Sequence, residues 1–251
     1  MQPSHIIKQK TGPDDPELQA NLQEALAQVS PDDLIAIADE LAARHERVFG
    51  NAELIPRYAT EVFAAVTHTK ANARTITNYF LQNDHAIINQ LLTGEAPTPV
   101  RVAIFVEQLT ALDTRLALEL ATGLLHNTDP SKNWLWTRWL WDPTVGTGIL
   151  PLLAGSIHNL VANNLADGYA KVGAVTALSV KFGEGTGLFT PELMSDAKRA
   201  PFANSAFLAC AYSVYLYGTT SWRLSREFNG LLPPLPLMAR RLLGLKKVNG
   251  N

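Results

Sequence analysis

Several residue types that usually mark a chemical site are scarce in this chain. Cys210 is the only cysteine, so the chain can form no internal disulfide and no cysteine-based metal site. It stands among Ala, Phe and Leu, which is typical of a small buried apolar residue. None of the six histidines lies three or four residues from another His or a Glu, the spacing of a helical metal pair. No metal site is therefore expected.

Two catalytic motifs are also missing. The chain has no Asp-Asp-x-x-Asp motif that would hold magnesium against a diphosphate, and no Gly-x-Ser-x-Gly nucleophile elbow. These absences argue against prenyl transfer and against an α/β-hydrolase. They leave no catalytic set and no cofactor that the sequence identifies.

Charge is sparse and unevenly distributed. Charged residues make up 18% of the chain, and the net charge is −2, which gives no general field to attract nucleic acid. Residues 1–61 carry 11 Asp/Glu against 5 Lys/Arg, whereas residues 191–251 carry 3 against 8. The two ends face different partners, attract each other or simply solvate different faces of the protein.

The N-terminal residues lack the basic and apolar segments of a secretory signal, so a cytoplasmic location is expected. Strand-like alternation is also absent. Helix signals recur instead, for example at Ser30-Pro31 and at Thr190-Pro191-Glu192. The sequence therefore predicts an all-α, bundle-like single domain over residues 1–251 with nine to eleven helices. A soft boundary between two lobes is placed near residues 128–133.

Periodic apolar residues locate individual helices. Segments 72–82 and 84–93 are expected to be short helices, and 102–125 one strong amphipathic helix. Residues 183–187, which contain three glycines, are expected to form a loop. Free backbone N–H groups in such a loop could hold an anion, although a plain turn is the simpler interpretation.

Two long runs, 143–166 and 201–222, contain no formally charged residue. Each is long enough to span a bilayer, but both contain polar residues that are costly in hydrocarbon. We expect them to form a buried core. Membrane insertion, docking at a membrane interface and contact with a partner chain remain the alternatives.

Four of the five tryptophans lie within residues 133–141, directly before the first uncharged run. They are interpreted as core anchors, as the wall of an apolar pocket or as an interfacial belt. His158 lies inside that run, where it is either a satisfied core histidine or a group that ligates haem or transfers a proton. The candidate ligand-binding residues are Trp136, Trp139, Leu153, His158 and Tyr212.

Residues 222–247 combine basic side chains with leucines and prolines. This composition suits either a solvated tail or peripheral contact with anionic lipid. A lipid surface is thus a candidate partner of this segment.

Residues 74–80, read Arg-Thr-Ile-Thr-Asn-Tyr-Phe and followed by Asp84 and Ile87, resemble the recognition-helix end of TetR-type repressors. The resemblance covers residues 60–92 and implies an all-helical regulator with a hydrophobic ligand domain. It departs at Lys70, which replaces the turn glycine, and the region is poor in Lys and Arg. Nucleic acid is consequently an unlikely partner on the sequence alone.

Three functions follow. The first is a binding protein whose apolar C-terminal half holds a hydrophobic small molecule, a lipid or a partner helix. The second is a helical enzyme acting on an apolar substrate in a buried cavity, and the third is the TetR-like regulator. Because excess apolar surface must be covered, a homo-oligomer is also considered.

Overall fold

A computed structural model describes residues 26, 29–50, 59–82, 86–110, 112–155, 157–221 and 233–245. Within these ranges the chain forms eleven α-helices, two 3₁₀ helices and no strand; a single isolated β-bridge joins Asp142 and Thr147. The predicted all-α fold and the predicted number of helices are confirmed. The elements are α2 (Pro31–Val48), α3 (Ala59–Ala65), η2 (Thr67–Asn72), α4 (Ala73–Gln82), α5 (Ala86–Thr93), α6 (Thr98–Gln108), α7 (Thr114–Thr128), α8 (Ile149–Ala154), η3 (Ile157–Leu160), α9 (Leu165–Gly185), α10 (Pro191–Ser195), α11 (Ala200–Ser221) and α13 (Leu235–Leu242).

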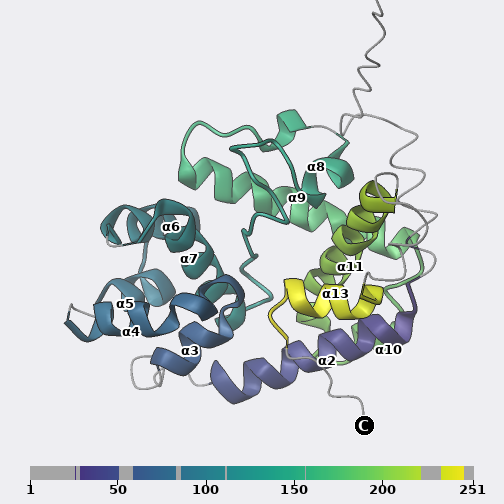
Figure 1. Cartoon of the computed structure of the whole chain (residues 1–251), viewed down its shortest axis with the longest axis horizontal. Helices are drawn as coiled ribbons and strands as arrows, with labels where there is room; N and C mark the ends of the chain where they lie inside the picture. Colours follow the sequence, from purple (N-terminus) through teal and green to yellow (C-terminus); the bar gives the residue numbers. More distant parts are fainter. Residues whose placement is uncertain are drawn as a thin grey trace, which may run out of the picture.

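The helices form two groups joined through the middle of the molecule (Figure 1). Helices α3 to α7 lie together on one side, and α11 packs on α2, α13 and α9 on the other. Helix α6 also packs on α9, which connects the two groups. Helix α7 lies inside, because every residue from 117 to 127 is buried. Its C-terminal end therefore delivers side chains to the centre of the protein.

Ion pairs join the acidic and basic ends of the chain. Asp39, Glu40 and Glu46 of α2 pair with Arg199, Arg240 and Lys198 at 2.9, 2.7 and 2.7 Å, respectively. The interpretation that the two ends attract each other is confirmed. Partly exposed pairs of this kind stabilise a protein by about 1 kcal/mol or less each. They therefore add to the stability of this arrangement but are not its main source.

Two predicted boundaries are wrong. The single helix expected over 102–125 is divided into α6 and α7, because the Asp113 side chain accepts hydrogen bonds from the N–H groups of Arg115 and Leu116 and begins a new helix. The predicted loop 183–187 is mostly helical, since α9 continues to Gly185. Only Thr186 and Gly187 form the turn, so the suggested anion-binding loop is absent.

The two uncharged runs fold differently from each other. The run 143–166 is broken into α8 and η3, with Gly148 and Gly155 at φ of 137° and 67°, values that side chains rarely permit. The run 201–222 lies almost wholly in α11. None of the helices in the described ranges is long and apolar enough to cross a membrane.

Helix α11 supplies much of the core. Phe202, Ala206, Phe207 and Ala209 are each at most 1% exposed. Cys210 is also buried there, and burial raises the pKa of its thiol to about 12. The prediction that Cys210 is a small apolar core residue is confirmed. The expectation of a buried core holds for most of this run, although Tyr212, Tyr215 and Tyr217 are only half-buried. It is wrong for much of the run 143–166, in which residues 143–145, 147, 159 and 161–164 are exposed.

The basic tail 222–247 is only partly described, because residues 222–232 and 246–247 lie outside the described ranges. Its central part, α13, packs on α2 and α11. Ala239 and Leu243 are buried, and Arg240 pairs with Glu40. The apolar side of α13 is thus used within the protein, and contact of this segment with lipid stays a prediction.

Residues 60–92, which carry the resemblance to TetR-type repressors, fall in α3, η2, α4 and α5, and residues 74–80 lie in α4. Arg74 and Asn78 are exposed on α4, and Ile87 is half-buried in α5, whereas Asp84 lies outside the described residues. The DNA-binding hypothesis remains an untested prediction.

Candidate ligand-binding cavity

A cavity of about 320 Å³ lies between α9, α10, α11 and the segment that follows α7. It reaches the surface beside Ser131, Ala177 and Met194, which are exposed. The wall is mostly aromatic and aliphatic, and among the described residues it contains no Asp, Glu, Lys or Arg. It is lined by His126, Pro130, Ser131, Asn133, Trp134, Leu135, Trp139, Leu140, Gly173, Thr176, Ala177, Val180, Phe189, Met194, Ala200, Pro201, Ala203, Asn204, Ser205 and Leu208.

The tryptophan-rich segment reaches this cavity because it is not helical. Residues 133–137 have no regular secondary structure, and glycines of α9 leave room for the indole rings of Trp134 and Trp136. A Cβ atom at Gly173 would lie 2.0 Å from the ring of Trp134, and one at Gly168 would lie 2.5 Å from the ring of Trp136. Helix α9 therefore needs glycine at both positions to let the tryptophans approach its backbone.

Trp134 is held firmly in place. Its indole N–H donates to the carbonyl oxygen of Tyr169 at 2.8 Å, and the two rings stack with centroids 5.2 Å apart. The Tyr169 hydroxyl donates in return to the carbonyl oxygen of Trp134 at 3.3 Å. One wall of the cavity is thereby fixed to α9.

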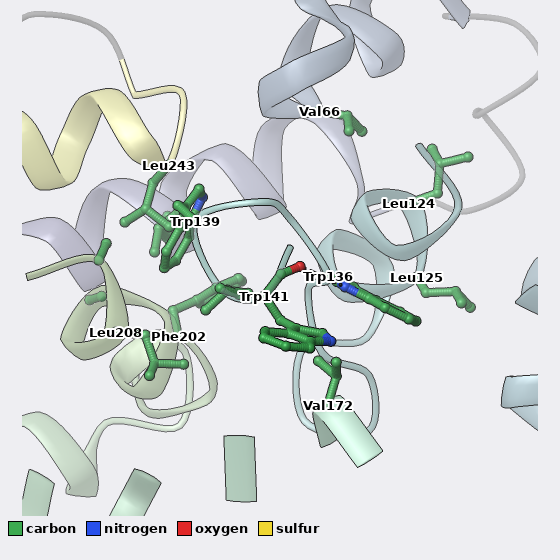
Figure 2. Packing of buried hydrophobic residues seen from close by; sticks show 14 of the residues in the cluster. Val66, Leu124, Leu125, Trp136, Trp139, Trp141, Val172, Phe202, Leu208 and Leu243 are labelled. Atoms are coloured by element: carbon green, nitrogen blue, oxygen red, sulfur yellow. Dashed lines mark hydrogen bonds between the residues drawn. The ribbon is translucent and has the colours of Figure 1, made fainter. Parts of the chain in front are cut away.

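The candidate residues chosen from sequence do not all meet at this cavity. Trp139 lines it. Trp136 is buried in the core, where its N–H donates to the carbonyl oxygen of Trp141 at 3.0 Å (Figure 2). Tyr212 is half-buried with its ring centroid 6.0 Å from that of Trp139, and Leu153 packs against the core. The side chain of His158, a residue of η3, lies outside what the structure describes.

The polar centre of the cavity is a histidine–serine pair that sequence reasoning missed. His126, at the end of α7, places Nδ1 2.8 Å from the carbonyl oxygen of Asn133 and Nε2 3.0 Å from the Ser205 hydroxyl. A carbonyl only accepts, so Nδ1 carries the ring proton and Nε2 accepts from Ser205. The two residues are 79 positions apart, and no local motif links them.

Burial keeps this histidine uncharged. Desolvation lowers the pKa of His126 to about 4, and electrostatic interactions with Arg44 and His45 act in the same direction against the hydrogen bond to Asn133. At neutral pH the imidazole is therefore a neutral acceptor. The part of the cavity wall that the structure describes is thus uncharged.

The pair resembles the nucleophile and base of a hydrolase, but its surroundings suit that chemistry poorly. A base with a pKa near 4 takes up a serine proton weakly at neutral pH. Ser205 lies inside α11, where backbone N–H groups are used by the helix and are not free to stabilise an oxyanion. The arrangement is better suited to holding a hydroxyl group in one orientation.

A second, smaller void of about 10 Å³ is also lined by His126. Its lining includes Arg44, whose two terminal nitrogens donate to the carbonyl oxygen of Leu243 at 2.7 Å and to Asn127 Oδ1 at 3.1 Å. Arg44 is 8% exposed and has no carboxylate within salt-bridge distance in the described part of the chain. Desolvation lowers its pKa to about 10. Glu119 lines the same void, and desolvation raises the pKa of its carboxyl.

No protein-family model, curated protein or solved structure matches this chain.

Proposed function

We propose that this protein binds a small, uncharged and largely apolar molecule in the cavity between α9, α10 and α11. The observation that supports the proposal is the composition of the wall. In the described part of the chain, it combines Trp134, Trp139, Phe189 and Leu208 with a few polar groups and no charged side chain. Ligand sites are typically concave, mostly apolar and of about 300 Å³ or more, with a small number of polar groups. A cavity of this volume suits a small molecule better than a partner helix.

The proposal is tested with Nile red, an uncharged apolar dye whose emission rises when it leaves water. We expect saturable binding by the native protein and a rise in melting temperature with dye concentration, because a ligand that binds only the folded state stabilises it by mass action. Quenching of tryptophan emission should follow the same saturation curve, since Trp134 and Trp139 line the cavity.

Two substitutions on α9 form a matched pair. Ala177 lines the cavity and is exposed at its opening, whereas Ala174 is exposed on the same helix and does not line it. We expect Ala177→Phe to weaken dye binding at least tenfold and Ala174→Phe to leave it unchanged. Equal binding by both variants, or no saturable binding by the native chain, contradicts the proposal.

A further inference from the structure

We infer that the ligand of this cavity is an uncharged molecule carrying an O–H or N–H donor, such as an alcohol, a phenol or an amide, which donates to the Ser205 hydroxyl oxygen. This inference rests on the proposed function and specifies the chemical class of the ligand.

The placement of the hydrogens in the His126–Ser205 pair determines what the Ser205 hydroxyl can offer a ligand. Nδ1–H of His126 is used by the carbonyl oxygen of Asn133, so Nε2 has only a lone pair to offer. The single hydrogen of the Ser205 hydroxyl is therefore directed at Nε2, 3.0 Å away. What Ser205 can still offer a ligand is the acceptor capacity of its oxygen.

The side chains of two neighbouring residues, Asn204 and Asn133, are occupied elsewhere. Trp139 Nε1 and Thr176 Oγ1 have no hydrogen-bond partner in the described part of the chain, but both atoms are buried and leave no accessible surface for a ligand to contact. Asn204 accepts from the Ser179 hydroxyl at 2.9 Å and donates to the carbonyl oxygen of Thr176 at 2.8 Å. The amide of Asn133 donates to the carbonyl oxygen of Asp129 at 3.1 Å. Both residues thus brace the wall, and Ser205 is the lining residue whose free capacity is fixed as an acceptor by its partner.

The charge of the ligand group decides which classes of ligand the cavity can accept. An ammonium group also donates, but none of the lining side chains that the structure describes is a carboxylate that could offset the cost of removing its charge from water. A carboxylate has no hydrogen to donate and would face the Ser205 lone pairs. An uncharged donor is the group that satisfies both the hydrogen-bond geometry and the uncharged wall.

The test compares four probes of nearly equal size: naphthalene, 2-naphthol, 2-methoxynaphthalene and 2-naphthoate, each displacing Nile red. We expect 2-naphthol to bind about five- to tenfold more tightly than naphthalene, the gain from one buried neutral hydrogen bond. The methoxy compound should gain nothing over naphthalene because it lacks the donor. 2-Naphthoate should bind at least tenfold more weakly than naphthalene.

Ser205→Ala should reduce the affinity for 2-naphthol to that for naphthalene and leave naphthalene binding unchanged. Ser213→Ala is the matched control, because Ser213 is buried on the same helix, donates to the carbonyl oxygen of Ala209 and does not line the cavity. If Ser205→Ala does not fold, the comparison of 2-naphthol with its methyl ether in the native chain decides the same question.

The outcomes distinguish the two proposals. Equal affinities for 2-naphthol, its methyl ether and naphthalene overturn the donor inference but leave the cavity as an apolar site. Tighter binding of 2-naphthoate overturns the uncharged class. Failure of naphthalene and Nile red to bind at all overturns the proposed function itself.

Discussion

His126 lines two regions that differ in the polar groups they contain. The first is the cavity of about 320 Å³, whose wall has no charged side chain among the described residues. The second is the smaller void of about 10 Å³, which is lined by the cation Arg44 and by Glu119. The cavity keeps its few polar groups neutral, whereas the smaller void buries a charge, and neutral oxygens accept hydrogen bonds from two of the three guanidinium nitrogens of Arg44.

The two regions also differ in the space that they leave for a ligand. The void has room for about one water-sized particle, so its polar groups serve the protein's own packing. The cavity is large enough for a ligand, and its polar groups are braced by each other and by backbone carbonyls. We therefore expect substitutions at the void to change stability and substitutions at the cavity to change binding.

The largest effect on the free energy of unfolding is expected at the smaller void. Arg44→Met should lower the free energy of unfolding by about 4 kcal/mol, because the buried carbonyl of Leu243 and Oδ1 of Asn127 lose their donors. Arg47→Met is the control, since Arg47 is exposed on the same helix, and its effect should stay within about 0.5 kcal/mol. Urea unfolding measures both, and similar values for the two variants would contradict the structural role of Arg44.

The pH dependence of stability should reveal the neutral state of His126. Its pKa is about 4 in the folded protein and about 6.5 in an unfolded chain, so the unfolded state gains a proton first as the pH falls. The free energy of unfolding should therefore fall by about 3 kcal/mol between pH 6.5 and 4 through this group. The difference between native and His126→Gln proteins in urea unfolding isolates the effect from that of the carboxylates. A histidine resonance of His126 titrating near pH 6.5 would disprove it.

On the cavity side, two glycines of α9 should respond with opposite signs. Gly173→Ala should destabilise the protein by about 2 kcal/mol, because the new Cβ atom overlaps the Trp134 ring and displaces a wall of the cavity. Gly185→Ala should stabilise it by about 0.5 kcal/mol, since nothing lies within 4 Å of that Cβ position. Thermal unfolding of both variants checks the signs, and Nile red affinity should fall only in Gly173→Ala.

The smallest expected effect is the absence of a reaction. A fluorophosphonate probe should not label Ser205, because its histidine partner is a weak base and α11 leaves no free N–H groups beside it. Intact-protein mass spectrometry with and without Ser205→Ala measures this. Rapid labelling that depends on Ser205 would favour the enzyme hypothesis over the binding hypothesis.

Much of the fold was predictable because it depends on local signals. Ser30 and Thr190 accept hydrogen bonds from backbone N–H groups at the starts of α2 and α10, as their Ser-Pro and Thr-Pro patterns indicate. The division between α6 and α7 was missed because apolar periodicity continues through it. The capping role of Asp113 was the available signal.

The cavity was less predictable. The tryptophan cluster led to Trp139, but Trp136 is a core residue, and His126 and Ser205 were not recognised. Glycines at 168 and 173 gave no sign that they receive indole rings, because the partners lie 32 to 39 positions away in the sequence. Contacts between segments that are far apart in the sequence produce no recognisable spacing of residues.

The sequence alone determined the helical class and indicated the burial of Cys210, because composition, periodicity and capping act locally. It left open whether the acidic beginning and the basic end attract each other, which the ion pairs between them decide. The tertiary structure decided which polar groups meet. Whether His126 bonds Ser205, or Arg44 bonds Leu243 from 199 positions away, depends on how α7, α11, α2 and α13 pack. Packing also sets burial, and burial fixes the neutral state of His126 on which the proposed ligand class depends.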